Sequence, residues 1–208
     1  MSTVDERKKK RTMLRIGPGT AGIRMTGAEF DAITDYDDLY RYELVRGVLV
    51  VSPLARPSES AATEYLGHCF RCYRAEHPLG PIMDATLAVQ YVATQETRRL
   101  ADRLFWCGLG RLPDVNADRP TVAIDFITKA RRHFPREYDI RRSEYGSLGI
   151  PEYWLFDRFL RVVTIFRPDG TTTVVKEGEM LRSPQLPGFE LDLKPLFGLT
   201  EGWDKPKR

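Results

Sequence analysis

Apolar residues recur along the chain with two periods, and each period predicts a different kind of element. Short alternating or continuous apolar runs predict strands. We expect such strands at about residues 85–92, 101–107, 121–127, 153–157, 161–166 and 172–176. The middle runs are the most apolar, so these strands should be central in a sheet.

Other segments repeat their apolar residues at helical spacing. Residues 57–76 open with Pro57 and predict a long helix. A second helix is expected over about 136–148, and a short one follows the capping pair Thr26 and Glu29. Residues 41–51 predict a hairpin that turns at Arg46-Gly47, and residues 186–191 predict a closing edge strand before a short helix.

This order of elements predicts an α/β or α+β fold with a mixed sheet flanked by helices. We expect a basic N-terminal tail over residues 1–25, one domain over residues 26–200 and a C-terminal tail over residues 201–208. The basic run in the first tail, Arg7 to Arg11, is either an arm that seeks phosphate or simply a solvated terminus.

Composition narrows the class of protein. The chain has 208 residues, 42% hydrophobic and 29% charged, as in ordinary soluble domains, and its net charge of +3 is weak evidence for a nucleic-acid partner. No apolar run reaches the roughly 18–20 residues of a membrane span, and the charged N-terminus lacks a signal core. The 3 cysteines do not suggest a disulfide framework, so we expect a cytoplasmic protein without membrane contact.

Two acids in apolar strands are the main candidates for chemistry. Asp102 lies in Ala-Asp-Arg-Leu-Phe-Trp, and Asp125 lies in Thr-Val-Ala-Ile-Asp-Phe-Ile. Neighbouring strands lie ~4.8 Å apart, so these carboxylates could share Mg²⁺ or Mn²⁺, which prefer oxygen ligands. The alternative is structural: Asp102 caps a turn, and Asp125 pairs with an arginine.

Arg141 falls on the apolar side of the helix predicted at about 136–148. At 100° per residue, Tyr138, Arg141, Tyr145 and Leu148 lie within about 80° of one another, whereas Arg142 lies at the edge of this face. A cation that points inward requires an anion. Asp102, Asp125 or a bound phosphate could supply it, and a plain Arg–carboxylate pair remains an alternative.

Other candidates have weaker support. Glu43 alternates with Tyr42 and Leu44, so it is either a third, inward ligand or strand decoration. Asp114 follows a proline in a glycine-rich segment and is better read as a turn residue than as a ligand. The segment Cys69-x-x-Cys72 beside His68 resembles half of a zinc site, but helix packing explains it better.

Five segments of the chain resemble the family of proposed restriction endonucleases often called Uma. They are Tyr42–Pro53, Ala101–Asp114, Pro120–Phe126, Gly149–Asp157 and Leu186–Leu191. The segment Gly-Ile-Pro-Glu-Tyr-Trp-Leu-Phe-Asp is the most specific of them. The resemblance extends over roughly residues 25–198.

The resemblance implies a fold of the PD-(D/E)xK nuclease superfamily and magnesium-dependent hydrolysis of DNA. Carried over by position, Glu43, Asp102 and Asp125 would be the acidic ligands. Asp125 stands where glutamate is usual, and Arg141 stands where the family has a lysine. Arginine stabilises phosphate charge but cannot transfer protons at neutral pH, and Lys129 is a weaker substitute.

The leading hypothesis is therefore a Mg²⁺- or Mn²⁺-dependent DNA endonuclease. Asp102, Asp125 and Glu43 would bind metal, and Arg141 would stabilise the transition state. The basic residues that would hold the DNA backbone without reading sequence are Arg131, Arg132, His133 and Arg136. One alternative is a nuclease-derived nucleic-acid-binding module with impaired catalysis, and another is a structural or oligomerisation protein with no nucleic-acid affinity. A homodimer is expected by analogy, since duplex cleavage needs two active sites.

Overall fold

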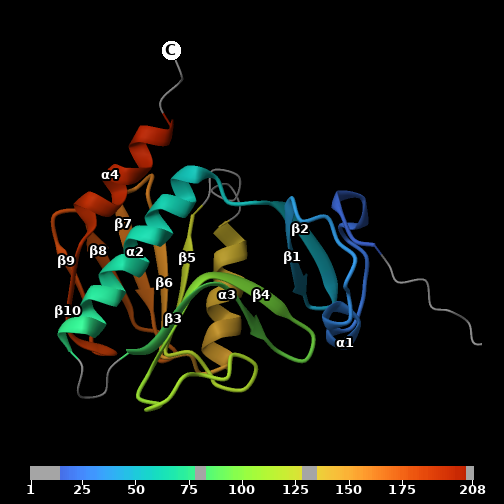
Figure 1. Cartoon of the computed structure of the whole chain (residues 1–208), viewed down its shortest axis with the longest axis horizontal. Coiled ribbons are helices and arrows are strands. Elements are labelled where there is room, and N and C mark those ends of the chain that lie inside the picture. The colour runs from blue at the N-terminus through green and yellow to red at the C-terminus, as the bar shows by residue number, and fades with distance from the viewer. Residues whose placement is uncertain (1–14, 78–82, 128–134, 205–208) are drawn as a thin grey trace, which may run out of the picture. The chain divides into compact units, whose positions relative to one another are not determined.

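The computed structural model describes residues 15–77, 83–127 and 135–204. The described residues divide into two compact units, one made of residues up to Leu54 with Thr94–Arg98, and one made of Ala55–Ala93 with Arg99 onward. In Figure 1 the ribbon is coloured by residue number, from blue at the N-terminus to red at the C-terminus. Each unit has its own hydrophobic core, and each is described separately below.

The first unit is built on a tight hairpin. Strands β1 (Tyr40–Val45) and β2 (Val48–Pro53) pair antiparallel, and Arg46 and Gly47 turn between them with φ of 50° and 75°. Two successive positive φ angles define the hairpin turn that matches strand twist, and glycine adopts such an angle easily. Helix α1 (Gly27–Asp31) has the predicted capping box: Thr26 accepts from the Glu29 N–H, and Glu29 accepts from the Thr26 N–H.

The second unit contains a mixed sheet in the order β3-β4-β5-β6-β7-β8. Its strands are β3 (Met83–Ala93), β4 (Arg98–Cys107, with Arg98 in the first unit), β5 (Val122–Phe126), β6 (Glu152–Asp157), β7 (Val162–Phe166) and β8 (Thr172–Lys176). Only β5 and β6 are joined in parallel among the pairs with a described register. They are connected through α3 (Pro135–Ser147), as a parallel crossover requires.

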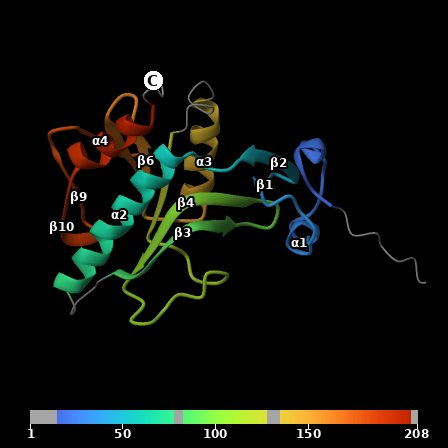
Figure 2. The same cartoon turned by 45° about the horizontal axis from the view of Figure 1, so that its top comes forward.

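Helices cover both faces of this sheet (Figures 1 and 2). On one face α2 (Pro57–Glu76) and α4 (Leu193–Asp204) pack with the hairpin of β9 (Met180–Ser183) and β10 (Leu186–Asp192). On the other face Tyr138 and Tyr145 of α3 pack against Ala101, Ala123 and Tyr153. All five residues of β5 are buried, which confirms its predicted central place.

The predicted α+β fold with a mixed sheet and flanking helices is confirmed, and α2 has the predicted bounds. Two details differ. Strand β9 was not predicted, because its alternation extends over four residues only. Strand β10 pairs with β9 in a separate two-stranded sheet and does not close the main sheet.

The predicted tails are shorter than expected where the structure describes them. Ile16 is 2% exposed and forms a bridge with Tyr36, so residues 15–25 belong to the folded first unit. Helix α4 continues to Asp204, four residues into the predicted C-terminal tail. The basic run Arg7–Arg11 lies outside the described residues, and the prediction of one domain over residues 26–200 stays a prediction.

Candidate active site

Asp102 and Asp125 lie side by side on adjacent antiparallel strands. Arg103 of β4 pairs with Ile124 of β5, so the same register sets Asp102 opposite Asp125. The Asp102 N–H donates to Oδ1 of Asp125 at 3.3 Å, and the Phe126 N–H donates to Oδ2 of Asp102 at 2.8 Å. Asp125 is 4% exposed, whereas Asp102 is half-buried. The predicted acid pair is therefore present, with Asp102 as its accessible member.

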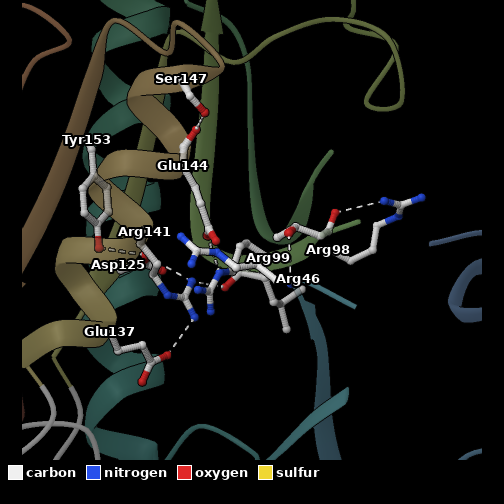
Figure 3. Close-up of polar contacts among 11 residues, drawn as sticks. Arg46, Arg98, Arg99, Asp125, Glu137, Arg141, Glu144, Ser147 and Tyr153 are labelled. Carbon is white, nitrogen blue, oxygen red and sulfur yellow. Dashed lines mark hydrogen bonds and ion pairs between the residues drawn. The ribbon is translucent and has the colours of Figure 1, made fainter. Parts of the chain in front are cut away.

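Arg141 extends from α3 toward Asp125, as the helical spacing predicted (Figure 3). Its Nη1 donates to Oδ2 of Asp125 at 3.3 Å and to the Leu100 carbonyl at 3.2 Å, and its Nη2 contacts Oε1 of Glu137 at 3.4 Å. The residue is 0% exposed. Burial of a guanidinium is costly unless acceptors surround it, and here carboxylate and carbonyl oxygens provide them.

Tyr153 of β6 is a third group on Asp125. Its hydroxyl donates to Oδ2 at 3.0 Å, the same oxygen that Arg141 contacts. Burial, followed by the neighbouring Asp125 charge, raises the pKa of Tyr153 well above its ordinary value. The phenol is consequently a neutral donor at physiological pH.

A second buried ion pair lies between β4 and α3 (Figure 3). Nε of Arg99 donates to Oε2 of Glu144 at 2.7 Å, and the two side chains are 3% and 13% exposed. Counted as ionised groups, the described set of Asp102, Asp125, Glu137 and Glu144 against Arg99 and Arg141 has two more negative than positive charges. This excess equals the charge of one divalent cation.

The donor chemistry of the acid pair fits magnesium better than zinc. Within the described ranges, no group of three or more His, Cys, Asp or Glu side chains could hold a metal ion. Mg²⁺ commonly binds through one or two carboxylates and keeps several waters, whereas structural zinc requires four protein ligands. Asp102 and Asp125 are the residues that could hold such an ion.

The other predicted site residues lie elsewhere. Glu43 is 1% exposed in β1 of the first unit, opposite Val50, and its role as a third ligand stays a prediction. Arg136 lies in the first turn of α3. The remaining basic candidates lie outside the described residues: Lys129, Arg131, Arg132 and His133.

Two weaker candidates are explained by local structure. Asp114 accepts from the Asn116 N–H at 2.9 Å, as expected for a turn residue. Sγ of Cys72 lies 3.5 Å from Nε2 of His68, one helical turn away on α2, and Cys69 packs against the core.

Sequence reasoning missed Glu137, Glu144, Arg99 and Tyr153 as parts of the site. Glu137 lies four residues before Arg141 on the same helix, and this spacing is a signal that could have identified Glu137 from the sequence. Tyr153 and Arg99 gave no such signal, because their contacts join residues that are 28 and 45 positions apart.

A family model described as "Putative restriction endonuclease", Uma2, matches residues 28–194. The chain belongs to the Uma2 family. The match covers the acid pair, Arg141 and Tyr153. Membership of this Uma2 family, together with the fold, supports a nuclease, and it confirms the resemblance read from the sequence.

The Uma2 fold also has a counterpart among solved structures. The chain is similar to a structure described as a putative nuclease belonging to DUF820 from Anabaena variabilis ATCC 29413, with a TM-score of 0.70 and 14% identity. The match covers 85% of this chain and 99% of that one, which shows a restriction-endonuclease-like fold. No curated protein matches the chain.

In this Uma2 chain, the two positions at which the sequence resemblance implies departures from the family pattern contact each other. Nη1 of Arg141 lies 3.3 Å from Oδ2 of Asp125.

Proposed function

We propose that this protein is a metal-dependent endonuclease that hydrolyses phosphodiester bonds in DNA. The observation that carries the proposal is the acid pair on β4 and β5, with Arg141 opposite it, in a chain of the Uma2 family. Asp102 and Asp125 would hold Mg²⁺ or Mn²⁺, with the carbonyl of Phe126 as a further ligand. A divalent cation bound there lowers the pKa of a coordinated water and neutralises phosphate oxygens.

Arg141 would contribute charge but no proton transfer, because a guanidinium stays protonated. Its Nη1 is engaged by Asp125 and Leu100. Its Nη2 donates to Oε1 of Glu137 at 3.4 Å, and the Glu137 side chain is 25% exposed. The positive charge of this guanidinium would stabilise the developing charge of the transition state.

The basic residues at the start of α3 would bind the DNA backbone. Three of them come before α3 in the sequence, namely Arg131, Arg132 and His133. The fourth, Arg136, lies in the first turn of α3, the helix that carries Arg141. Their contacts would be insensitive to sequence and would weaken with salt. We also propose a homodimer, as cleavage of both strands requires two sites, and a cytoplasmic location. In the described part of the chain, the structure contains no helix with the length and apolar character of a membrane span.

Nicking of supercoiled plasmid with Mg²⁺ tests the enzyme. Wild type should nick, and the Asp102→Ala/Asp125→Ala double variant should not. Asp169→Asn is a matched control, because Asp169 is an exposed acid whose bonds stay within its own turn to Thr171. Equal activity of wild type and the double variant would refute the enzyme proposal.

One observation favours a second function, a binding module without turnover. Both oxygens of Asp125 already accept protein donors, as in a structural ion pair. An inactive wild type that cleaves after Asp125→Glu/Arg141→Lys, and that shows salt-dependent gel shifts before it, would support this module. Absence of any gel shift would exclude both functions.

A further inference from the structure

Tyr153 and Arg141 both donate to one oxygen of Asp125, Oδ2, at 3.0 Å and 3.3 Å (Figure 3). Oδ1 accepts the backbone N–H of Asp102 at 3.3 Å, and it is therefore the oxygen on the side of Asp102. These contacts fix the rotation of a carboxylate that a short side chain would otherwise leave free to turn.

The fold holds the Tyr153 ring rigidly enough for this role. Strands β5 and β6 run parallel with Ala123 opposite Tyr153, so Tyr153 and Asp125 project from the same face of the sheet, toward α3. The ring of Tyr145 meets it edge-on with centroids 5.1 Å apart, and Phe166 stacks on it at 5.8 Å. At 2% exposure the ring has little room to move, and its hydroxyl points at Asp125.

The direction of this hydrogen bond follows from the chemistry of the two groups. A carboxylate only accepts, so the phenol must donate. A hydroxyl that keeps its proton is an orienting group and not an acid or base for the reaction. Hydrogen bonds of this kind to metal-ligating carboxylates orient the ligand, and their loss lowers metal affinity.

We propose that Tyr153 is a positioning residue for cation binding: by holding Oδ2 of Asp125, it turns Oδ1 toward Asp102 so that the two acids present oxygens to one divalent ion. The inference rests on the proposed function, because it assumes a cation at the acid pair. It adds a residue from β6 to a site that is otherwise built from β4, β5 and α3.

Calorimetric titration of the full chain with Mn²⁺, without DNA, tests the proposal. Tyr153→Phe keeps the ring and its packing but removes the donor, and we expect Mn²⁺ to bind roughly 10- to 100-fold more weakly. Tyr73→Phe is the matched control. It also removes a buried hydroxyl, which donates to the Pro187 carbonyl among the residues that pack with α2, and it should bind Mn²⁺ as wild type does.

A second variant keeps the proposal testable if Tyr153→Phe does not fold. Phe166→Leu leaves the hydroxyl in place but removes the stacked ring, so Mn²⁺ binding should weaken, by less than about 10-fold. Thermal unfolding of each variant separates a loss of fold from a loss of affinity.

The outcomes distinguish this inference from the proposed function. Wild type that binds Mn²⁺, Asp102→Asn that does not, and Tyr153→Phe that binds as tightly as wild type would overturn the role of Tyr153 alone. Equal weakening by Tyr153→Phe and Tyr73→Phe would also overturn it. Wild type that binds no Mn²⁺ would overturn the metal site and the positioning role together.

Discussion

Asp102 and Asp125 are joined through backbone N–H groups, each carboxylate accepting from the strand that carries the other. Asp125 accepts from the Asp102 N–H, and Asp102 accepts from the N–H of Phe126, the residue after Asp125. The side-by-side placement of the two acids is therefore a property of β4–β5 pairing and does not require a cation to assemble it.

The two acids should differ in their contribution to stability. Asp125→Asn leaves Arg141, which is 0% exposed, without its main counter-charge, so the free energy of unfolding should fall by about 3–5 kcal/mol. Asp102→Asn removes a half-buried charge, and its amide oxygen can still accept from Phe126, so the change should stay within about 1 kcal/mol. Urea unfolding measures both, and equal losses would contradict the assignment of Asp125 as the structural member.

Changes at Asp125 and Arg141, which contact each other, should show strong coupling. Asp125→Glu alone adds a methylene between Arg141 and Tyr153, and overpacking of a buried site costs about 1–3 kcal/mol. Arg141→Lys alone shortens the partner and loses planar contacts. The double variant restores the length balance, so its destabilisation should be smaller than the sum of the two single changes. A double-mutant cycle by urea unfolding measures the coupling, and strict additivity would argue against compensation.

Glu152, in the most specific family segment, should matter for stability and not for nicking. This carboxylate is 0% exposed and accepts from Arg167, Trp154 and Ser183. Glu152→Gln breaks the ion pair, but Arg167 is 24% exposed and can be hydrated, so we expect a loss of about 2 kcal/mol. Chemical denaturation gives the loss, and a plasmid assay on the folded variant should show wild-type nicking.

Gly67 of α2 should resist substitution although it lies within a helix. Alanine there normally stabilises a helix by up to about 1 kcal/mol. A Cβ at Gly67, however, would lie 2.6 Å from Nη2 of Arg103, a buried guanidinium that donates to the Thr63 carbonyl and to Thr86. Displacing it costs hydrogen bonds to a charged group, so Gly67→Ala should destabilise by about 1–3 kcal/mol. A rise in the thermal midpoint would show that Arg103 can move freely.

Cys107 should make the fold sensitive to alkaline pH. Burial raises the pKa of its thiol from the ordinary value of 9.0 to about 12. Below pH 9 the thiol is protonated in both folded and unfolded chains and adds no pH dependence. Between pH 9 and about 12 the unfolded chain loses the proton first, so stability falls as pH rises through this window.

The same shift predicts selective thiol chemistry. Cys72 is exposed on α2, whereas Cys107 is partly buried and protonated, so iodoacetamide at pH 8 should label Cys72 first. Peptide mass spectrometry identifies the labelled cysteine. Labelling of Cys107 at the rate of Cys72 in folded protein would contradict the pKa direction, and Cys107→Ser should flatten the alkaline loss of stability.

The sequence by itself determined the elements and the directions of the main charged side chains. Periodicity located α2 and the strands, because burial of one face imposes a repeat of 3.6 or 2 residues. The same argument placed Arg141 on the inner face of α3, and it lies there. Apolar neighbours around Asp125 predicted a buried carboxylate with a partner, and the structure supplies one.

Only the tertiary structure decided which atoms meet. Strand periodicity fixes a face but not a register, and a shift of one residue would have turned Asp102 away from Asp125. The bonds from Tyr153 to Asp125 and from Arg99 to Glu144 join segments whose separation along the chain carries no local signal. The folding of residues 15–25 onto their unit likewise depends on long-range bridges, at Ile16 with Tyr36 and at Arg24 with Val48, which local composition does not encode.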